Sequence, residues 1–440
     1  MTLKTLIVAL CALSFFTSLA AAQDLGFERD RHKSILAMVR DDVKKNYFDP
    51  SYKGLDLDAK YKEALEKLNK ATSVGQFSGI VAQFLLDFDD SHLFYAPPGR
   101  ANRVRYGFDF AMVGDRCFIT RVQPKSDADA KGLQVGDELY SIDNYQPTRE
   151  NLWKMQYFFY GLRPQPGLDL VVIKPNGKNA QISVASKVIL GKKVMDMTGM
   201  DGGIDMHQVE RESEDAEKRM LKQYFYDKLE GVFIWRIPGF MLDPSKVDDI
   251  MARARKYPAL VIDLRGNGGG RVDMVLRLIS NVFSTDTKVY DEHSRKETKE
   301  VIAKSRGADA YTGKLVVLID SGSASASEIF SRVVQVEKRG QIMGDRSAGA
   351  VMEARHFDHQ LGMDTVIFFG TSVTVADLIM KDGKSLEKVG VVPDVNILPT
   401  GKDLAQKRDI VLAAALDALG LKVTPEEAGK IFPEDVSEVD

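Results

Sequence analysis

The amino-acid sequence predicts an α/β protein in which a helical region and a β-rich region come before the α/β core. Three patterns support this prediction. Residues 24–90 carry apolar side chains at helical spacing, residues 104–187 read as short alternating strands, and buried strands alternate with helices from residue 231 onward. A chain of 440 residues is long enough for two or three domains.

The composition is that of an ordinary globular protein. Hydrophobic residues make up 44% of the chain, charged residues make up 28%, and the formal net charge is −3. Such a charge balance gives no indication of binding to nucleic acids or other polyanions, which attract strongly basic proteins. We therefore expect no nucleic-acid partner.

Residues 1–22 read as a secretory signal peptide. Lys4 provides the charged start, an apolar run extends from Leu6 to Leu19, and the small residues Ala20, Ala21 and Ala22 follow. The run is too short for a spanning helix, and no later stretch is long and apolar enough to be one. Cleavage after Ala22 would leave Cys117 as the single cysteine, so no internal disulfide is expected. We expect an exported protein, periplasmic or extracellular.

A helical domain is expected over residues 23–99. Three helices with apolar faces are predicted at Glu28–Lys45, Asp58–Lys70 and Ser73–Phe88. The third helix leads into an acidic, polar exit that contains Ser91 and His92.

A β-rich domain is expected over residues 104–187. Strands are predicted at Cys117–Val122 and Asp137–Ile142, and a hairpin joins Leu168–Ile173 to Ala180–Val184. The charged stretch that follows predicts a solvated helix at Arg211–Tyr226.

The α/β core is expected over residues 188–402, with a helical tail over 403–440. The buried strand Ala259–Leu264 runs into the glycine-rich loop Arg265–Gly270. This loop has neither the spacing of a dinucleotide-binding loop nor the Gly-Lys-Ser/Thr of a P-loop, so no nucleotide cofactor is expected. In the tail, the apolar spacing predicts an amphipathic helix at Asp403–Leu421, and Thr424-Pro425-Glu426-Glu427 predicts the capped start of a short helix after it.

The stretch Lys314–Phe330 is the most informative part of the core. A buried strand is followed by the small residues 321–327 and then by a helix with apolar residues on one face. Such a turn can expose a serine hydroxyl and direct the free N–H groups of the helix start at an anion. A serine-rich helix cap, with Glu328 in the first turn, is the structural alternative.

A serine becomes a good nucleophile when a base takes its proton, which directs attention to the six histidines. His356 and His359 are three residues apart in a predicted strand, so their side chains point to opposite faces and no metal site is expected there. His92 follows a run of acidic residues at a domain exit. From the residues alone it is either a base or an ordinary surface histidine.

Three motifs in order resemble the peptidase family of the C-terminal processing proteases and the tricorn core protease. They are residues 263–270 (Asp-Leu-Arg-Gly-Asn-Gly-Gly-Gly), 323–330 (Ser-Ala-Ser-Ala-Ser-Glu-Ile-Phe) and 390–394 (Gly-Val-Val-Pro-Asp). In that family the middle serine of the second motif is the nucleophile, which implies Ser325. The resemblance also implies a crotonase-like, ClpP-like ββα core with an inserted PDZ-like domain and an N-terminal helical bundle.

A second resemblance concerns residues 104–187. The segments 106–110 (Tyr-Gly-Phe-Asp-Phe) and 132–139 are similar to those of a PDZ domain. Such a domain holds the C-terminal carboxylate of a peptide with backbone N–H groups, which here would come from Tyr106, Gly107 and Phe108. A β-rich spacer with the same strands is the alternative reading.

The resemblance departs from the family pattern at one important position. Where the processing proteases have a lysine base, this chain has Ala350, which cannot accept a proton. The tricorn branch instead uses a Ser-His pair and a glutamate just before Gly-Val-x-Pro-Asp, which implies Ser91, His92 and Glu387. The expected roles are His92 as general base, with Ser91 and Glu387 orienting the catalytic pair.

The oxyanion hole implied by the same resemblance consists of two backbone N–H groups, those of Ala326 and Gly269. We thus expect a serine endopeptidase without metal or cofactor, acting on a protein or peptide substrate. Two alternatives remain open: an inactive peptide- or ligand-binding scaffold, which Ala350 motivates, and an esterase with the same acyl-transfer machinery.

Overall fold

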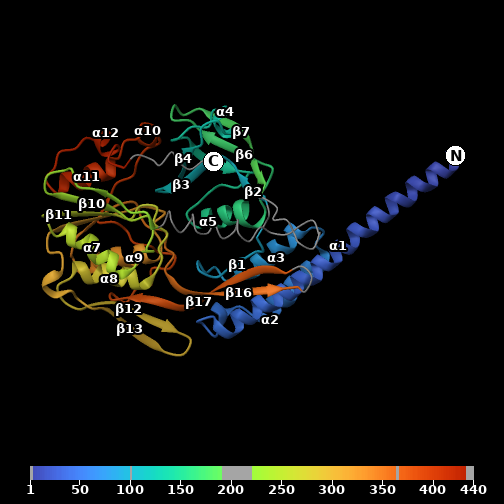
Figure 1. The fold of residues 1–440 in the computed structure, drawn as a ribbon, viewed down its shortest axis with the longest axis horizontal. Coiled ribbons are helices and arrows are strands. Elements are labelled where there is room, and N and C mark those ends of the chain that lie inside the picture. Colours follow the sequence, from blue (N-terminus) through green and yellow to red (C-terminus); the bar gives the residue numbers. More distant parts are fainter. Residues whose placement is uncertain (1–2, 100–101, 191–220, 363–365, 433–440) are drawn as a thin grey trace. The chain divides into compact units, whose positions relative to one another are not determined.

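The computed structural model describes residues 3–99, 102–190, 221–362 and 366–432. The chain divides into two compact units. The first consists of residues 1–99, 161–163 and 353–376, and the second of residues 100–160, 164–352 and 377–440. Each unit is described by itself (Figure 1).

The first unit is built on three helices. They are α1 (Leu3–Asn46), α2 (Leu57–Lys70) and α3 (Val74–Leu86), with a short 3-10 helix at Tyr52–Gly54. The three predicted helices are therefore confirmed, α1 beginning well before residue 28. Asp56 and Ser73 cap α2 and α3 by accepting hydrogen bonds from backbone N–H groups of the first turn. The buried faces supply Ile35, Val39, Leu68, Phe77, Val81 and Leu85.

A small sheet completes the first unit. β1 (Phe94–Ala96) pairs antiparallel with β17 (Ile367–Met380), Phe94 lying opposite Ser372, and β16 (Met352–Leu361) also pairs with β17. The N–H of Phe48 donates to the carbonyl of Thr374 at 3.0 Å. β1 and the segment just after α1 thus contact a strand that follows them in the chain by 278 residues (Phe94 to Ser372) and 326 residues (Phe48 to Thr374).

The second unit contains the β-rich region, whose predicted strands and hairpin are confirmed. Its five-stranded antiparallel sheet has the order β3-β4-β5-β6-β7, which leaves β3 at one edge of the described sheet. The strands are β3 (Phe108–Val113), β4 (Arg116–Val122), β5 (Glu138–Ile142), β6 (Gly167–Ile173) and β7 (Asn179–Ala185). The short helices α4 (Asp127–Ala130) and α5 (Leu152–Gln156), a π-helical turn (Tyr157–Leu162) and the pair β2 (Asn102–Arg105) and β8 (Lys187–Leu190) accompany this sheet.

The α/β core of the second unit has a six-stranded sheet of order β18-β15-β14-β11-β10-β9. β10, β11, β14, β15 and β18 run parallel, and β9 pairs antiparallel with β10. The strands are β9 (Tyr224–Tyr226), β10 (Val232–Arg236), β11 (Ala259–Asp263), β14 (Lys314–Ile319), β15 (Gln341–Gly344) and β18 (Val395–Asn396).

Helices cover both faces of this sheet (Figure 1). α7 (Pro244–Ala254), α8 (Val272–Val282) and α9 (Ala326–Val336) lie together on one side. On the other side α11 (Ile410–Ala418) and α12 (Pro425–Ala428) share an apolar core with β10, β11, β14 and β15. The loops that follow the parallel strands lie at the C-terminal ends of these strands, where ligands of α/β folds bind.

Two predictions about helices need correction. Tyr224–Tyr226, expected at the end of a helix, forms strand β9, because this aromatic segment pairs with β10 beside Trp235; residues 211–220 lie outside the described part of the chain. The helix predicted at Asp403–Leu421 is in fact α10 (Gly401–Ala405) followed by α11, interrupted where Lys407 has a φ of 54°. The short helix predicted after it is confirmed as α12, which Thr424 caps. The remaining elements are β12 (Thr287–Ser294), β13 (Thr298–Ala303) and a 3-10 helix at Gly307–Asp309.

A search of the helices within the described ranges finds none that combines the length and apolar character required to cross a bilayer.

Candidate active site

The serine turn, residues 320–327, connects the end of β14 to the start of α9. Ser325 has a φ of 54° and a ψ of −116°, a region that residues with a side chain rarely adopt. Such backbone strain costs about 1–3 kcal/mol and persists where the surroundings enforce it. Here the N–H of Ser325 donates to the carbonyl of Ala350 at 2.9 Å and to Oε2 of Glu328 at 3.0 Å.

The backbone around Ser325 is suited to stabilising an anion. Ala326 is the first residue of α9, so its N–H has no partner within the helix, and no hydrogen bond engages it in the described part of the chain. Gly269 lies against the turn. A Cβ added to Gly269 would lie 2.7 Å from the Cβ of Ser325 and 3.2 Å from the backbone nitrogen of Ala326. The fold therefore brings three sequence-predicted site residues together.

The N–H of Gly269 already has a partner in this conformation. It donates to Oδ1 of Asn267 at 2.8 Å. Acting as an oxyanion donor would require Gly269 to exchange this bond for one to the substrate. Asn267 makes two further hydrogen bonds that fix the loop. Its side-chain Nδ2 donates to the carbonyl of Ile237 at 2.9 Å, and its backbone carbonyl accepts from the N–H of Ala324 at 2.9 Å.

The side chain of Glu328 is hydrogen-bonded to the serine turn. Its side chain is fully buried and accepts four hydrogen bonds. The donors are the N–H of Ser325 (3.0 Å), the hydroxyl of Ser347 (2.6 Å), and the N–H groups of Gly349 (2.8 Å) and Ala350 (2.9 Å). Burial raises the pKa of Glu328 to about 7, although these hydrogen bonds lower it. From the sequence Glu328 is expected only in the first turn of a capped helix, whereas in the structure its buried carboxylate also joins the serine turn to the loop at residues 347–350.

Ala350 and Glu387 belong to two loops that are bonded to each other. The N–H of Lys388 donates to the carbonyl of Gly349 at 2.7 Å, and the N–H of Val351 donates to Oε2 of Glu387 at 3.0 Å. Since Ala350 contacts Ser325 through its carbonyl, Glu387 is linked to the serine turn through the adjoining residues 350 and 351.

Ser91 and His92 lie in the first unit, in the turn between α3 and β1. The hydroxyl of Ser91 is 2.7 Å from Nδ1 of His92, and the imidazole is half-buried. Burial lowers the pKa of His92, as does the charge of His356, while the charge of Asp90 raises it. The imidazole is thus neutral at pH 7, the form that can accept a proton.

Asp90 is a buried carboxylate next to the Ser91-His92 pair, and it was not among the residues predicted for the site. Its buried carboxylate accepts from the hydroxyl of Tyr47 (2.9 Å), the hydroxyl of Thr374 (2.6 Å) and the N–H of His92 (3.0 Å). The acidic run before His92 was the available signal, but two of the three donors are distant in sequence. Asp90 fixes the backbone that carries the imidazole.

The residues proposed to bind a peptide carboxylate lie at the start of edge strand β3. Tyr106 and Phe108 are buried in the core of the β-rich domain, and the hydroxyl of Tyr106 accepts from the N–H of Gln165 at 2.7 Å. Gly107 has a φ of 77°, and an added Cβ would lie 2.5 Å from that of Ser126. Any contact with a carboxylate would therefore come from backbone N–H groups in this loop.

The two histidines of β16 have separate surroundings. Nε2 of His359 is 2.7 Å from Oδ2 of Asp42, whereas the ring of His356 packs edge-on against Phe94, with 6.1 Å between ring centroids. Within the described residues, no group of three or more histidine, cysteine or acidic side chains is arranged to hold a metal ion.

Comparisons with known proteins agree with this architecture. Residues 232–397 match peptidase family S41, and residues 99–154 match the PDZ domain family. Mature CPAF has a similar fold, with a TM-score of 0.63 and 15% sequence identity over 86% of this chain and 94% of that chain. At that identity the likeness concerns the fold alone.

Two curated relatives are similar in sequence. The tail-specific protease of Haemophilus influenzae is 25% identical over 326 residues, which are 70% of this chain and 44% of the relative. A CtpA-like serine protease of Staphylococcus aureus is 28% identical over 294 residues, 60% of this chain and 55% of the relative. The chain thus spans about half the length of these relatives.

Proposed function

Because residues 232–397 match peptidase family S41, we propose that this chain is a serine endopeptidase of that family that forms an acyl-enzyme on Ser325. The single observation that supports this most is the strained turn at the head of α9. There Ser325, the open N–H of Ala326 and the close-packed Gly269 meet. Acyl transfer requires a nucleophile beside backbone donors in this way.

In the proposed reaction, Ser325 attacks the peptide carbonyl while His92 takes its proton and later passes it to the leaving amine. The lowered pKa of His92 supports the role of base, since the imidazole is neutral at pH 7. With Ser91 at Nδ1, the proton would be taken by Nε2. Ser91 and Glu387 orient the catalytic pair, and the oxyanion is held by Ala326 and by Gly269 once it leaves Asn267.

The absence of a lysine base favours a second candidate, an inactive binding scaffold. Ala350 stands at the lysine position of the processing proteases; its carbonyl accepts from the N–H of Ser325, and its N–H donates to the side chain of Glu328. Treatment of the full chain with a fluorophosphonate probe separates the two functions, because labelling needs an activated serine. We expect labelling of the wild type but not of Ser325→Ala; equal labelling of both would favour the scaffold.

The assignment of the base has its own test. His92→Ala should lower turnover by roughly 10³–10⁴ with the fold retained, whereas Ala350→Lys should give no gain. Near-normal turnover by His92→Ala would remove the tricorn-like mechanism. Cleavage of activated esters but of no peptide would instead indicate an esterase.

The proposed setting is outside the cytoplasm, in the periplasm or the extracellular space, after removal of residues 1–22. The proposed substrate is a protein or peptide whose C-terminal carboxylate is held by the loop at Tyr106, Gly107 and Phe108, with its last residues added beside edge strand β3. A titration with peptide acids and the matching amides tests this. Equal affinity for both would exclude carboxylate recognition.

A further inference from the structure

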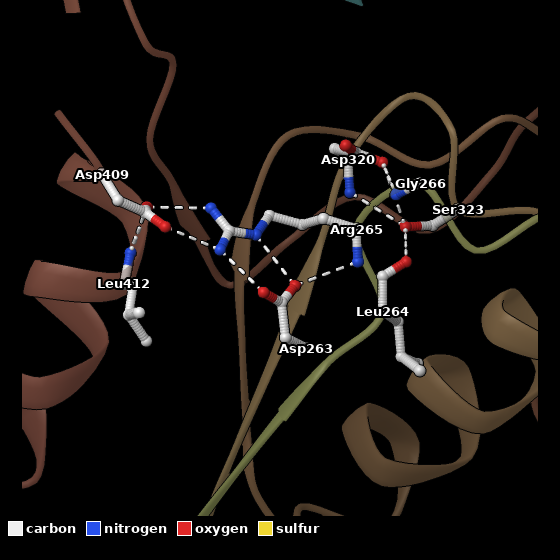
Figure 2. A network of polar contacts seen from close by, with 8 residues as sticks. All are labelled: Asp263, Leu264, Arg265, Gly266, Asp320, Ser323, Asp409 and Leu412. Atoms are coloured by element: carbon white, nitrogen blue, oxygen red, sulfur yellow. Dashed lines mark hydrogen bonds and ion pairs between the residues drawn. The ribbon is translucent and has the colours of Figure 1, made fainter. Parts of the chain in front are cut away.

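Arg265, the first residue of the glycine-rich loop, is held between two carboxylates (Figure 2). Nε and Nη2 donate to the two oxygens of Asp263 at 2.8 and 2.7 Å, and Nη1 and Nη2 donate to those of Asp409 at 2.8 and 2.8 Å. Both pairs are bidentate, the geometry that restricts a guanidinium group most strongly. Asp263 is fully buried, and the side chains of Arg265 and Asp409 are only 18% and 19% exposed.

The loop after Arg265 is bonded directly to the serine turn. The N–H of Gly266 donates to Asp320 at 2.8 Å, and the N–H of Asp320 bonds to the hydroxyl of Ser323 at 3.0 Å. That hydroxyl in turn donates to the carbonyl of Leu264 at 2.8 Å (Figure 2). A displacement of Arg265 would therefore be transmitted to the backbone that surrounds Ser325.

Asp409 lies outside the part of the chain that the family comparison covers, which ends at residue 397. It caps α11 by accepting from the N–H of Leu412 at 2.9 Å. The helix is itself fixed to the sheet, because Val411, Leu412 and Leu416 belong to the apolar core shared with β11 and β14. Asp409 is thus a rigid support on the C-terminal segment.

We propose that Asp409 is a positioning residue for catalysis, which acts through Arg265 to hold the glycine-rich loop, residues 265–270, at the distance from Ser325 that acyl transfer needs. This inference rests on the proposed peptidase function. It assigns the C-terminal helical segment a part in the reaction beyond covering the sheet. A loop that is free to move by even 1 Å would lower turnover while leaving substrate binding largely intact.

The charges of Arg265, Asp263 and Asp409 indicate which substitution disturbs the structure least. One guanidinium faces two carboxylates, with Arg236 and Asp320 nearby. Burial opposes ionisation of Asp409, but Arg265 outweighs it and lowers the pKa, so Asp409 is charged at neutral pH. Removal of this one charge leaves Arg265 and Asp263 as a balanced pair. Loss of Arg265 would leave two carboxylates facing each other, which costs far more.

Asp409→Asn is therefore the test, since asparagine still caps a helix. The matched control is Asp403→Asn in the same segment. Asp403 accepts from the N–H of Thr400, the N-cap of α10, and pairs with Arg408 at 2.9 Å, and in the described part of the chain its side-chain contacts stay within residues 400–408. For peptide cleavage by the full chain, we expect kcat about 10-fold lower for Asp409→Asn with KM within about twofold, and near-normal values for Asp403→Asn.

Equal kcat for the two variants would overturn the inference, as would a loss that lies wholly in KM. Melting temperatures check that both variants are folded at the assay temperature. Should Asp409→Asn unfold, Asp409→Ser decides in its place, since serine also caps well.

A double-variant cycle adds a readout that a purely structural role would not give. If Asp409 acts through Arg265, Arg265→Lys combined with Asp409→Asn should lose no more kcat than the worse single variant. Losses that multiply would overturn the inference. A wild type that cleaves no peptide would overturn the proposed function, and this inference with it; an active wild type with an unaffected Asp409→Asn overturns the inference alone.

Discussion

Two buried carboxylates, one in each unit, hold the backbone of the proposed catalytic residues. Asp90 accepts the N–H of His92, two residues after it, and Glu328 accepts the N–H of Ser325, three residues before it. Their other partners differ. Asp90 is bonded to the hydroxyls of Tyr47 and Thr374, whereas Glu328 is bonded mainly to backbone N–H groups of the neighbouring loop.

The charge around the two carboxylates differs as well. Nζ of Lys53 lies 3.7 Å from Asp90. The hydrogen-bond donors that the structure describes around Glu328 are neutral, and the pKa of Glu328 rises to about 7 because of burial. The proposed nucleophile is thus held by a carboxyl group with a pKa near neutrality, surrounded by backbone N–H groups. The proposed base is held by a carboxylate that is itself fixed by two hydroxyl groups beside a cation.

The crowding on the nucleophile side gives the largest expected effect. In Gly269→Ala the new methyl group would lie 2.7 Å from the Cβ of Ser325, while at Gly268 an added Cβ meets nothing within 4 Å. We expect Gly269→Ala to lower kcat by roughly 10²–10³, comparable to loss of an oxyanion donor, and Gly268→Ala to be much milder. Steady-state peptide cleavage measures both. Equal losses would show that crowding against Ser325 is not what matters.

Glu328→Gln comes next, with a loss in turnover of about 10–100-fold. Glutamine has one carbonyl oxygen and one NH2 group, so two of the four donors around position 328 would face another donor. Glu337→Gln, at the exposed end of the same helix, is the control, since Glu337 pairs with Lys381 at the surface. A Glu328→Gln enzyme as active as this control would contradict a holding role for Glu328.

Glu328→Gln should also change how the free energy of unfolding depends on pH. The pKa of Glu328 is raised from 4.5 in the unfolded chain to about 7 in the fold. The unfolded chain therefore releases this proton first, and the free energy of unfolding falls by up to about 3 kcal/mol as the pH rises from 4.5 to 7. Glu328→Gln should lack this part of the pH dependence, as denaturant titrations at pH 5 and pH 8 would show. An unchanged pH dependence would argue against the raised pKa.

The sequence predicted much of this molecule, and the exceptions have physical reasons. Periodic apolar residues gave α2, α3 and β11 nearly to the residue, and the motifs indicated Ser325. The helical spacing of apolar residues wrongly predicted a continuous helix through residues 406–409. There the helix is interrupted at Lys407, and Asp409 is the N-cap of the next one. The roles of Asp90 and Glu328 were missed because their partners are backbone N–H groups and distant hydroxyls, which a sequence does not place.

On the base side, Asp90→Asn should have a smaller effect, about 10-fold on turnover, because hydrogen-bonding capacity is partly retained. It should also move the acid limb of the pH profile of kcat/KM to lower pH, since the charge of Asp90 raises the pKa of His92. The control is Asp87→Asn, which removes a nearby carboxylate paired with Lys60. An acid limb at the same pH as in the wild type would show that Asp90 does not raise the pKa of His92.

The smallest expected effect is that of His356, whose positive charge lowers the pKa of His92. His356→Gln should therefore raise that pKa and move the acid limb to higher pH, opposite to Asp90→Asn. His359→Gln, which loses the pair with Asp42 and the ring stacking on Phe369, should not move the limb. If both neighbours act on His92 through charge alone, the double variant Asp90→Asn/His356→Gln should bring the limb back toward its wild-type position. The acid limb of the double variant could instead lie at the same pH as that of one single variant. That result would show that one of the two residues acts by holding the imidazole in place. The pH profiles of kcat/KM for the wild type, the two single variants and the double variant decide between these outcomes.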